Sequence, residues 1–199
     1  MTKIKLCGLS RAEDIEVANE ILPEFVGFVF YSKSKRCITP EKAAALKNLL
    51  DKKISAVGVF VNEKIETVAE IAKFLDLIQL HGNEDANYIS TLRNYINKKI
   101  IQAFKIKTAD DLNLAKNSRA DFILLDSGAG TGEIFNWQLL KNFERQYFLA
   151  GGLNVENVSD AVKNLKPFAV DVSSGIETNN FKDAAKMKKF VSIVRSENL

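Results

Sequence analysis

Eight short β-rich runs, each followed by a segment with helical spacing, predict an α/β chain folded as a (β/α)8 TIM barrel. Each β/α unit takes about 25 residues, which is close to the lower size limit of this fold and leaves no room for a second domain. Of the 199 residues, 46% are hydrophobic, enough for one sizeable core. We therefore expect residues 1–199 to form a single barrel domain, with an open doubly wound sheet as the alternative.

The expected strands are runs rich in β-branched and aromatic residues. In chain order they are KIKL (3–6), FVGFVF (25–30), ISAVGVFV (54–61), LIQL (77–80), IIQAFKI (100–106), DFILL (121–125), QYFLA (146–150) and FAVDVS (168–173). Because a helical segment follows each run, the strands are expected to be parallel.

Between these runs, apolar residues recur every three or four positions, as in helices that cover a sheet. Examples are Ala12, Ile15, Ala18 and Leu22, then Ala86, Ile89, Leu92 and Ile96, and finally Ala184, Met187, Val191 and Val194. Several helix starts can also be predicted from capping residues. They are a capping box of Ser10 and Glu13, Thr39 before a proline at the first helical position, and caps at Asn62, Asn83 and Asn154.

The amino-acid composition argues against several classes of function. The 28 basic and 25 acidic residues include no basic block interleaved with aromatics, so we expect no nucleic-acid partner. The chain has no apolar run of about 18 residues and no signal-like segment, so we expect no membrane association. Two cysteines, Cys7 and Cys37, then favour a reducing compartment, the cytoplasm. With one histidine and no zinc-spaced cysteine pair, we expect neither a metal nor a cofactor.

In this barrel the active site lies at the C-terminal ends of the strands. The loops AGGL (150–153) and SSGI (173–176) follow the seventh and eighth strands, where backbone N–H groups often bind phosphate. Tight turns between strand and helix would also explain their glycines. Because two neighbouring strands share the feature, we expect a small phosphorylated molecule as the partner.

Cys7 ends the first strand at this rim. A thiol acts as a base only when ionised, so its pKa of about 8.5 must be lowered, as nearby cations and helix N-termini can do. If Cys7 points inward, Lys5 does too, about 7 Å from the sulfur. Barrel closure places the eighth strand beside the first, so we expect Lys5 to pair with Asp171. The alternative is that Lys5 faces outward and reaches solvent between helices.

Asp126 ends the sixth strand, nearly across the barrel from Cys7. Aspartate is also common as a turn former or helix cap. A thiol and a carboxyl on opposite sides of a phosphate-binding mouth provide a base and an acid for moving protons on either side of a sugar. His81, the sole imidazole, either contacts the substrate or ties its loop down.

Seven segments together resemble the phosphoribosylanthranilate isomerase family of tryptophan biosynthesis. They run in the family's order along nearly the whole chain: KIKLCGL, GFVFYSKSKR, VGVFVNE, IQLHGNED, DSGAGTGEIFNW, FLAGGLNVENV and VDVSSGIET. The resemblance implies an Amadori rearrangement of N-(5-phosphoribosyl)anthranilate to a deoxyribulose phosphate ketoamine, with Cys7 as general base and Asp126 as general acid.

The resemblance also implies how the substrate is held. Arg36 would contact the anthranilate carboxylate, and the phosphate would bind the backbone of Gly152, Ser174 and Gly175. His81 and Asp171 are further candidates for substrate contacts. Asp126 would start protonated and Cys7 as a thiolate, so each needs a shifted pKa.

The chain departs from the family pattern at three places. Lys35 stands where a proline often precedes the arginine, and Asn180 lies in a segment that is usually proline-glycine. Asn180 could still adopt the left-handed turn. Glu133 and Asn136 stand where we expect lysine or glutamine and aspartate. None of these positions is the predicted acid or base.

Two alternatives remain for the function. One is another phosphate-binding barrel of amino-acid biosynthesis, such as indole-glycerol-phosphate synthase or the sugar isomerase of the histidine pathway; a thiol at position 7 argues against both. The other is a barrel that only binds sugar phosphates, and the presence of Cys7 and Asp126 argues against it. For the oligomeric state we expect a monomer, with a homodimer as the alternative.

Overall fold

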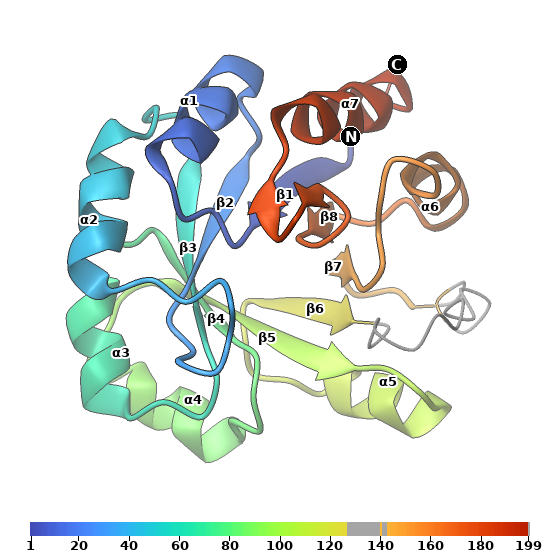
Figure 1. The fold of residues 1–199 in the computed structure, drawn as a ribbon. Coiled ribbons are helices and arrows are strands. Elements are labelled where there is room, and N and C mark those ends of the chain that lie inside the picture. Colours follow the sequence, from blue (N-terminus) through green and yellow to red (C-terminus); the bar gives the residue numbers. More distant parts are fainter. Residues whose placement is uncertain (127–139, 141–142, 199) are drawn as a thin grey trace.

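The computed structural model describes residues 1–126, 140 and 143–198. In this part of the chain eight parallel strands pair in sequence order, and the last pairs with the first to close a barrel (Figure 1). They are β1 (Lys3–Cys7), β2 (Phe25–Val29), β3 (Ser55–Phe60), β4 (Leu77–Leu80), β5 (Lys99–Lys105), β6 (Phe122–Asp126), β7 (Tyr147–Ala150) and β8 (Ala169–Val172). The predicted barrel is confirmed, and the open sheet is wrong.

Seven helices of the described residues surround this barrel (Figure 1). They are α1 (Ala12–Ile21), α2 (Pro40–Leu49), α3 (Ile65–Ala72), α4 (Ala86–Leu92), α5 (Ala109–Lys116), α6 (Val158–Leu165) and α7 (Ala184–Ser196). None of them is long and apolar enough to cross a membrane. A short antiparallel hairpin, β9 (Glu177–Thr178) and β10 (Phe181–Lys182), lies between β8 and α7 and was not predicted.

The barrel interior divides into an apolar lower part and a polar upper part. Aromatic rings fill the lower part, with Phe25 and Phe148 centred 5.3 Å apart and Phe122 stacked on Phe168 at 5.2 Å. Because side chains alternate along a strand, the residues that follow inward on the same strands reach the C-terminal rim. The packed floor leaves the rim as the end where a substrate can enter.

The seam between β1 and β8 closes the barrel. Lys5 lies opposite Asp171 in the register, and its Nζ is 2.9 Å from Oδ1. Lys5 is fully buried, so the predicted ion pair is confirmed and the outward-facing alternative is wrong. Burial opposes the charge on Lys5, but Asp171 and Cys7 outweigh that effect and raise the pKa of the ammonium.

The predicted start of α1 is partly wrong. The carboxylate that serves it is Asp14, which accepts the backbone N–H groups of Ser10 and Arg11 and the Arg11 guanidinium. Glu13 is not the capping residue, because the helix begins one residue later than the Ser10 cap requires. The Thr39 cap of α2 is confirmed, since its hydroxyl accepts the Lys42 N–H at 3.3 Å.

The asparagine caps are wrong for two helices. Lys64 and Asp85 occupy the cap positions of α3 and α4. Asn62 instead accepts the backbone N–H of Asn83 through Oδ1, which joins the loops after β3 and β4. Short polar side chains readily bond nearby loop backbone in this way. At α6 the cap position is Asn157, and the side chain of Asn154 accepts the N–H groups of residues 156 and 157 just before it.

The buried pair predicts a large effect on stability. Lys5→Met leaves Asp171 buried without its countercharge, so the free energy of unfolding should fall by about 3–5 kcal/mol in urea titrations. The double variant Lys5→Met/Asp171→Leu should recover most of that loss, because neither charge remains buried. Equal losses in both variants would contradict the role of the pair.

Candidate active site

A cavity of about 340 Å³ opens at the C-terminal rim of the barrel. Seven of the eight predicted site residues line it: Cys7, Arg36, His81, Asp126, Gly152, Asp171 and Ser174. Gly175 adjoins Ser174 but does not itself line the cavity. Residues predicted from separate strands and loops are therefore brought together in one place.

Cys7 points into the cavity from the end of β1. A Cβ on Gly27 would stand 2.7 Å from the Cys7 sulfur and 3.2 Å from Nζ of Lys5. The ammonium thus lies nearer the sulfur than the two-residue spacing of about 7 Å suggested. Glycine at position 27 leaves the room in which the two groups meet.

The protonation of Cys7 differs from the expectation. Burial raises the pKa of the thiol above its ordinary value, and the ammonium groups of Lys5 and Lys182 offset only part of this effect. The neighbouring cations do lower the pKa, as expected, but burial outweighs them, so the net direction is upward. Lack of solvation is the reason, since an isolated thiolate is costly away from water.

Asp126 ends β6 and faces His81 from the end of β4. Nε2 of His81 lies 3.3 Å from Oδ2 of Asp126, and Nδ1 lies 3.0 Å from the side-chain nitrogen of Gln79. The imidazole of His81 therefore lies between Gln79 on one side and Asp126 on the other. Gln79 was not predicted, although period-two spacing on β4 places it on the same inward face as His81.

The two glycine-rich loops pack against each other. Gly151 and Gly152 have positive φ angles of 93° and 64°, which glycine adopts without strain. A Cβ on Gly175 would lie 2.0 Å from the carbonyl oxygen of Leu153, so glycine there permits direct backbone contact between the loops. Turn geometry and close packing therefore explain these glycines, while Gly152 and Ser174 also face the cavity.

Arg36 lies in the loop after β2 and is held by Glu177 of the hairpin. Its Nε and Nη2 donate to the two carboxylate oxygens at 2.5 and 2.7 Å. Lys182 donates to the same carboxylate at 2.7 Å and to the carbonyl and hydroxyl oxygens of Ser173. The Ser173 hydroxyl in turn donates to the carbonyl of Cys7 at 3.0 Å. Glu177 and Lys182 were missed because the hairpin itself was not predicted.

Two of the departures from the family pattern contact each other. Nζ of Lys35 donates to Oδ1 of Asn180, which joins the loop after β2 to the hairpin. Asn180 has a φ of 66°, so the predicted left-handed turn is confirmed. Glu133 and Asn136 lie outside the described residues.

A family model, N-(5'-phosphoribosyl)anthranilate (PRA) isomerase, matches residues 4–193. The chain belongs to this family. It is 47% identical to the N-(5'-phosphoribosyl)anthranilate isomerase of Thermoanaerobacter sp. (strain X514) over 98% of both chains. The crystal structure of the phosphoribosyl anthranilate isomerase from Thermotoga maritima is similar, with a TM-score of 0.91, 37% identity and coverage of 98% of this chain and 100% of that one.

A second solved structure is a phosphoribosyl anthranilate isomerase in complex with reduced 1-(o-carboxyphenylamino)-1-deoxyribulose 5-phosphate. It has a TM-score of 0.89 and 37% identity, and the match covers 98% of this chain and 100% of that one. The resemblance seen in the seven sequence segments is therefore confirmed as membership of the isomerase family.

The environment of Cys7 predicts the pH at which it ionises. In Cys37→Ser protein, the thiolate absorbance of Cys7 should appear only above the ordinary range of free thiols, about pH 8.5, because burial raises its pKa. The Cys7→Ser/Cys37→Ser variant should lack that signal and so identifies its source. A midpoint below the ordinary value would contradict the effect of burial.

Proposed function

We propose that this chain isomerises N-(5'-phosphoribosyl)anthranilate to 1-(2-carboxyphenylamino)-1-deoxyribulose 5-phosphate, a step of tryptophan biosynthesis, with Cys7 as the base and Asp126 as the acid. One observation carries the assignment of these roles: a thiol and a carboxyl from opposite strands line the same cavity in a member of the isomerase family. A thiol and a carboxyl on two sides of a cavity can act as base and acid on a sugar held between them, which supports the proposal.

The reaction begins with opening of the furanose ring. Protonated Asp126 gives its proton to the ring oxygen as the bond from that oxygen to C1 breaks. The lone pair of the anthranilate nitrogen then forms a C1–N double bond, which gives a protonated Schiff base. The contact of His81 with Asp126 supports this role, because an acid must be held at one position to deliver its proton.

The second half of the reaction moves a proton from C2. The thiolate of Cys7 removes this proton, the electrons form a C1–C2 double bond, and the nitrogen regains its lone pair. The resulting enolamine becomes the ketone when its C2 hydroxyl loses a proton and C1 gains one. Lys5 provides the positive charge beside the sulfur that stabilises the thiolate, and Asp171 holds Lys5 in place.

The substrate has two anionic ends, and the cavity offers a binding group for each. We place its phosphate at the backbone of Gly152, Ser174 and Gly175, where two loops meet beside β7 and β8. We place its carboxylate at Arg36. His81 and Asp171 remain candidates for further contacts, because both line the cavity.

We further propose that the chain acts as a monomer in the cytoplasm. Both cysteines are free, as is usual for proteins of a reducing compartment. Light scattering of the purified chain distinguishes the monomer from the homodimer.

The catalytic roles predict the effect of two substitutions. Cys7→Ser and Asp126→Asn should each lower kcat by about 10²–10⁴-fold, because each removes one positioned proton-transfer group. The assay follows loss of fluorescence of freshly generated phosphoribosylanthranilate. Circular dichroism shows that each variant is folded, and near-normal turnover in either folded variant would contradict its assigned role.

The contact between His81 and Asp126 predicts a second kinetic effect. His81→Asn should lower kcat about five- to tenfold with little change in KM, because it removes the imidazole contact that positions the acid. A higher KM at unchanged kcat would instead assign His81 to substrate binding.

A further inference from the structure

The ion pair between Arg36 and Glu177 lies beside the proposed substrate cavity. The side chain of Glu177 is only 6% exposed and that of Arg36 is 21% exposed, so both charges are largely removed from water. Such a pair has to offset a desolvation penalty. Its placement next to a binding site therefore calls for an explanation beyond stability.

The geometry leaves part of the guanidinium available. Arginine has five N–H donors, and Glu177 takes one on Nε and one on Nη2. Among the described residues no hydrogen-bond partner of Arg36 Nη1 is found. The Nη1 and Nη2 groups thus retain a second edge of the planar fork, which fits a carboxylate through two parallel bonds.

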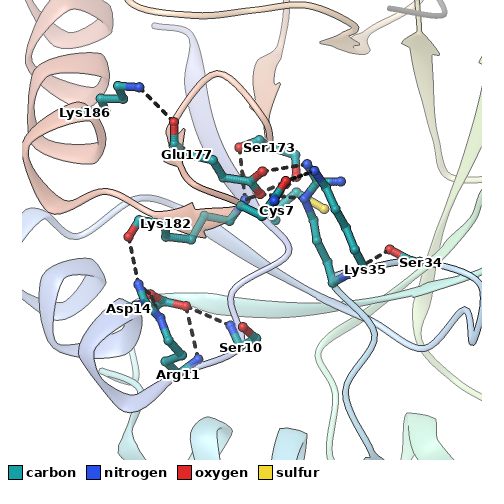
Figure 2. A network of polar contacts seen from close by, with 12 residues as sticks. Cys7, Ser10, Arg11, Asp14, Ser34, Lys35, Ser173, Glu177, Lys182 and Lys186 are labelled. Atoms are coloured by element: carbon teal, nitrogen blue, oxygen red, sulfur yellow. Dashed lines mark hydrogen bonds and ion pairs between the residues drawn. The ribbon is translucent and has the colours of Figure 1, made fainter. Parts of the chain in front are cut away.

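The two residues also lie at different depths. Arg36 lines the cavity, whereas Glu177 does not. Glu177 accepts the guanidinium N–H groups from its position on the hairpin. Lys182 of the same hairpin donates to this carboxylate (Figure 2). A ligand in the cavity can therefore reach the remaining edge of Arg36 without displacing Glu177.

The local charge favours an anion at that edge. Arg36 and Lys182 carry two positive charges, and Glu177 supplies one negative charge between them. Burial alone would raise the pKa of Glu177, but hydrogen bonds from Arg36 and Lys182 outweigh it and lower the pKa, so the carboxylate is ionised near neutral pH. Arg36, Lys182 and Glu177 together therefore have a net charge of one positive unit. Arg36 is the member of this group that lines the cavity.

We propose that Glu177 is a positioning residue that fixes the guanidinium of Arg36 so that its second edge binds the carboxylate on the aromatic ring of the substrate. The proposal rests on the proposed function, because that function supplies an aromatic carboxylate at Arg36. Glu177 thereby determines specificity for an ortho-carboxylated arylamine over the unsubstituted arylamine.

The opposite role is also chemically conceivable, since Glu177 could compete with the substrate carboxylate for Arg36. The two roles predict effects of opposite sign. If Glu177 positions Arg36, its removal weakens binding of a carboxylated ligand. If it competes, its removal strengthens that binding.

The test compares two ligands and two variants. The ligands are reduced 1-(o-carboxyphenylamino)-1-deoxyribulose 5-phosphate and its phenylamino counterpart without the carboxyl group, with dissociation constants measured by calorimetry. Glu177→Gln keeps the size of the side chain and removes its charge. Asn180→Gly is the matched control, because it removes the Lys35 contact between the same loop and hairpin while leaving Arg36 and Glu177 in place.

Glu177→Gln should weaken binding of the carboxylated ligand about tenfold or more, as expected for loss of a charge-assisted hydrogen bond. Binding of the ligand without the carboxyl group should change little, and Asn180→Gly should bind both ligands as the wild type does. Equal weakening of both ligands by Glu177→Gln, unchanged binding or tighter binding of the carboxylated ligand would each overturn the proposal.

A second variant covers the case in which Glu177→Gln does not fold. Glu177→Asp keeps the charge beside Lys182 but shortens the reach to Arg36, and it should weaken only the carboxylated ligand. Failure of both variants to fold would make Glu177 a structural residue and overturn the proposal. If the wild-type protein binds both ligands equally, the proposed carboxylate site at Arg36 is contradicted as well. If the wild-type protein and the Glu177 variants all prefer the carboxylated ligand to the same degree, only the role of Glu177 is contradicted.

Discussion

The ion pair of Lys5 and Asp171 fixes the register in which the barrel closes. Both charges are buried, so each requires the other, and they meet only when β1 and β8 pair as observed. A shift by one residue would turn Lys5 outward and with it Cys7, because side chains alternate along a strand. The same interaction that closes the barrel therefore also presents the thiol to the cavity and places an ammonium beside it.

The polar rim depends on the apolar floor beneath it. Aromatic rings such as Phe148 fill the interior of the barrel toward the N-terminal ends of the strands. The polar side chains lie above these rings, toward the C-terminal rim. A dry floor makes each charge at the rim more costly to leave alone, which is why Lys5, Glu177 and Lys182 all have charged partners. The pair of Arg36 and Glu177 also joins the loop after β2 to the hairpin after β8 beside the cavity.

The features that were predicted correctly from the sequence are those that depend on the local periodicity of the residues. The alternation of strands and the inward direction of Lys5, Cys7 and Asp171 depend on the period of two and on barrel closure, and these were predicted. The asparagine caps failed because Asn62 bonds across to another loop. Glu177 was missed because its partner Arg36 lies 141 residues away, a distance that no local pattern spans. The pKa direction of Cys7 was wrong because sequence suggests neighbours but does not measure burial.

A raised pKa makes the thiolate of Cys7 a stronger base once it has formed, and it leaves a smaller fraction of the thiol ionised near neutral pH. In the free protein, the uncompensated positive charge of Arg36, Lys182 and Glu177 is close enough to interact with Cys7. In the proposed complex the substrate carboxylate neutralises that charge, which leaves Lys5 as the main cation stabilising the thiolate. A thiolate that loses part of its stabilisation becomes a stronger base toward the C2 proton. Substrate binding and base strength are then coupled through Arg36, and Glu177 controls both because it fixes where that guanidinium lies.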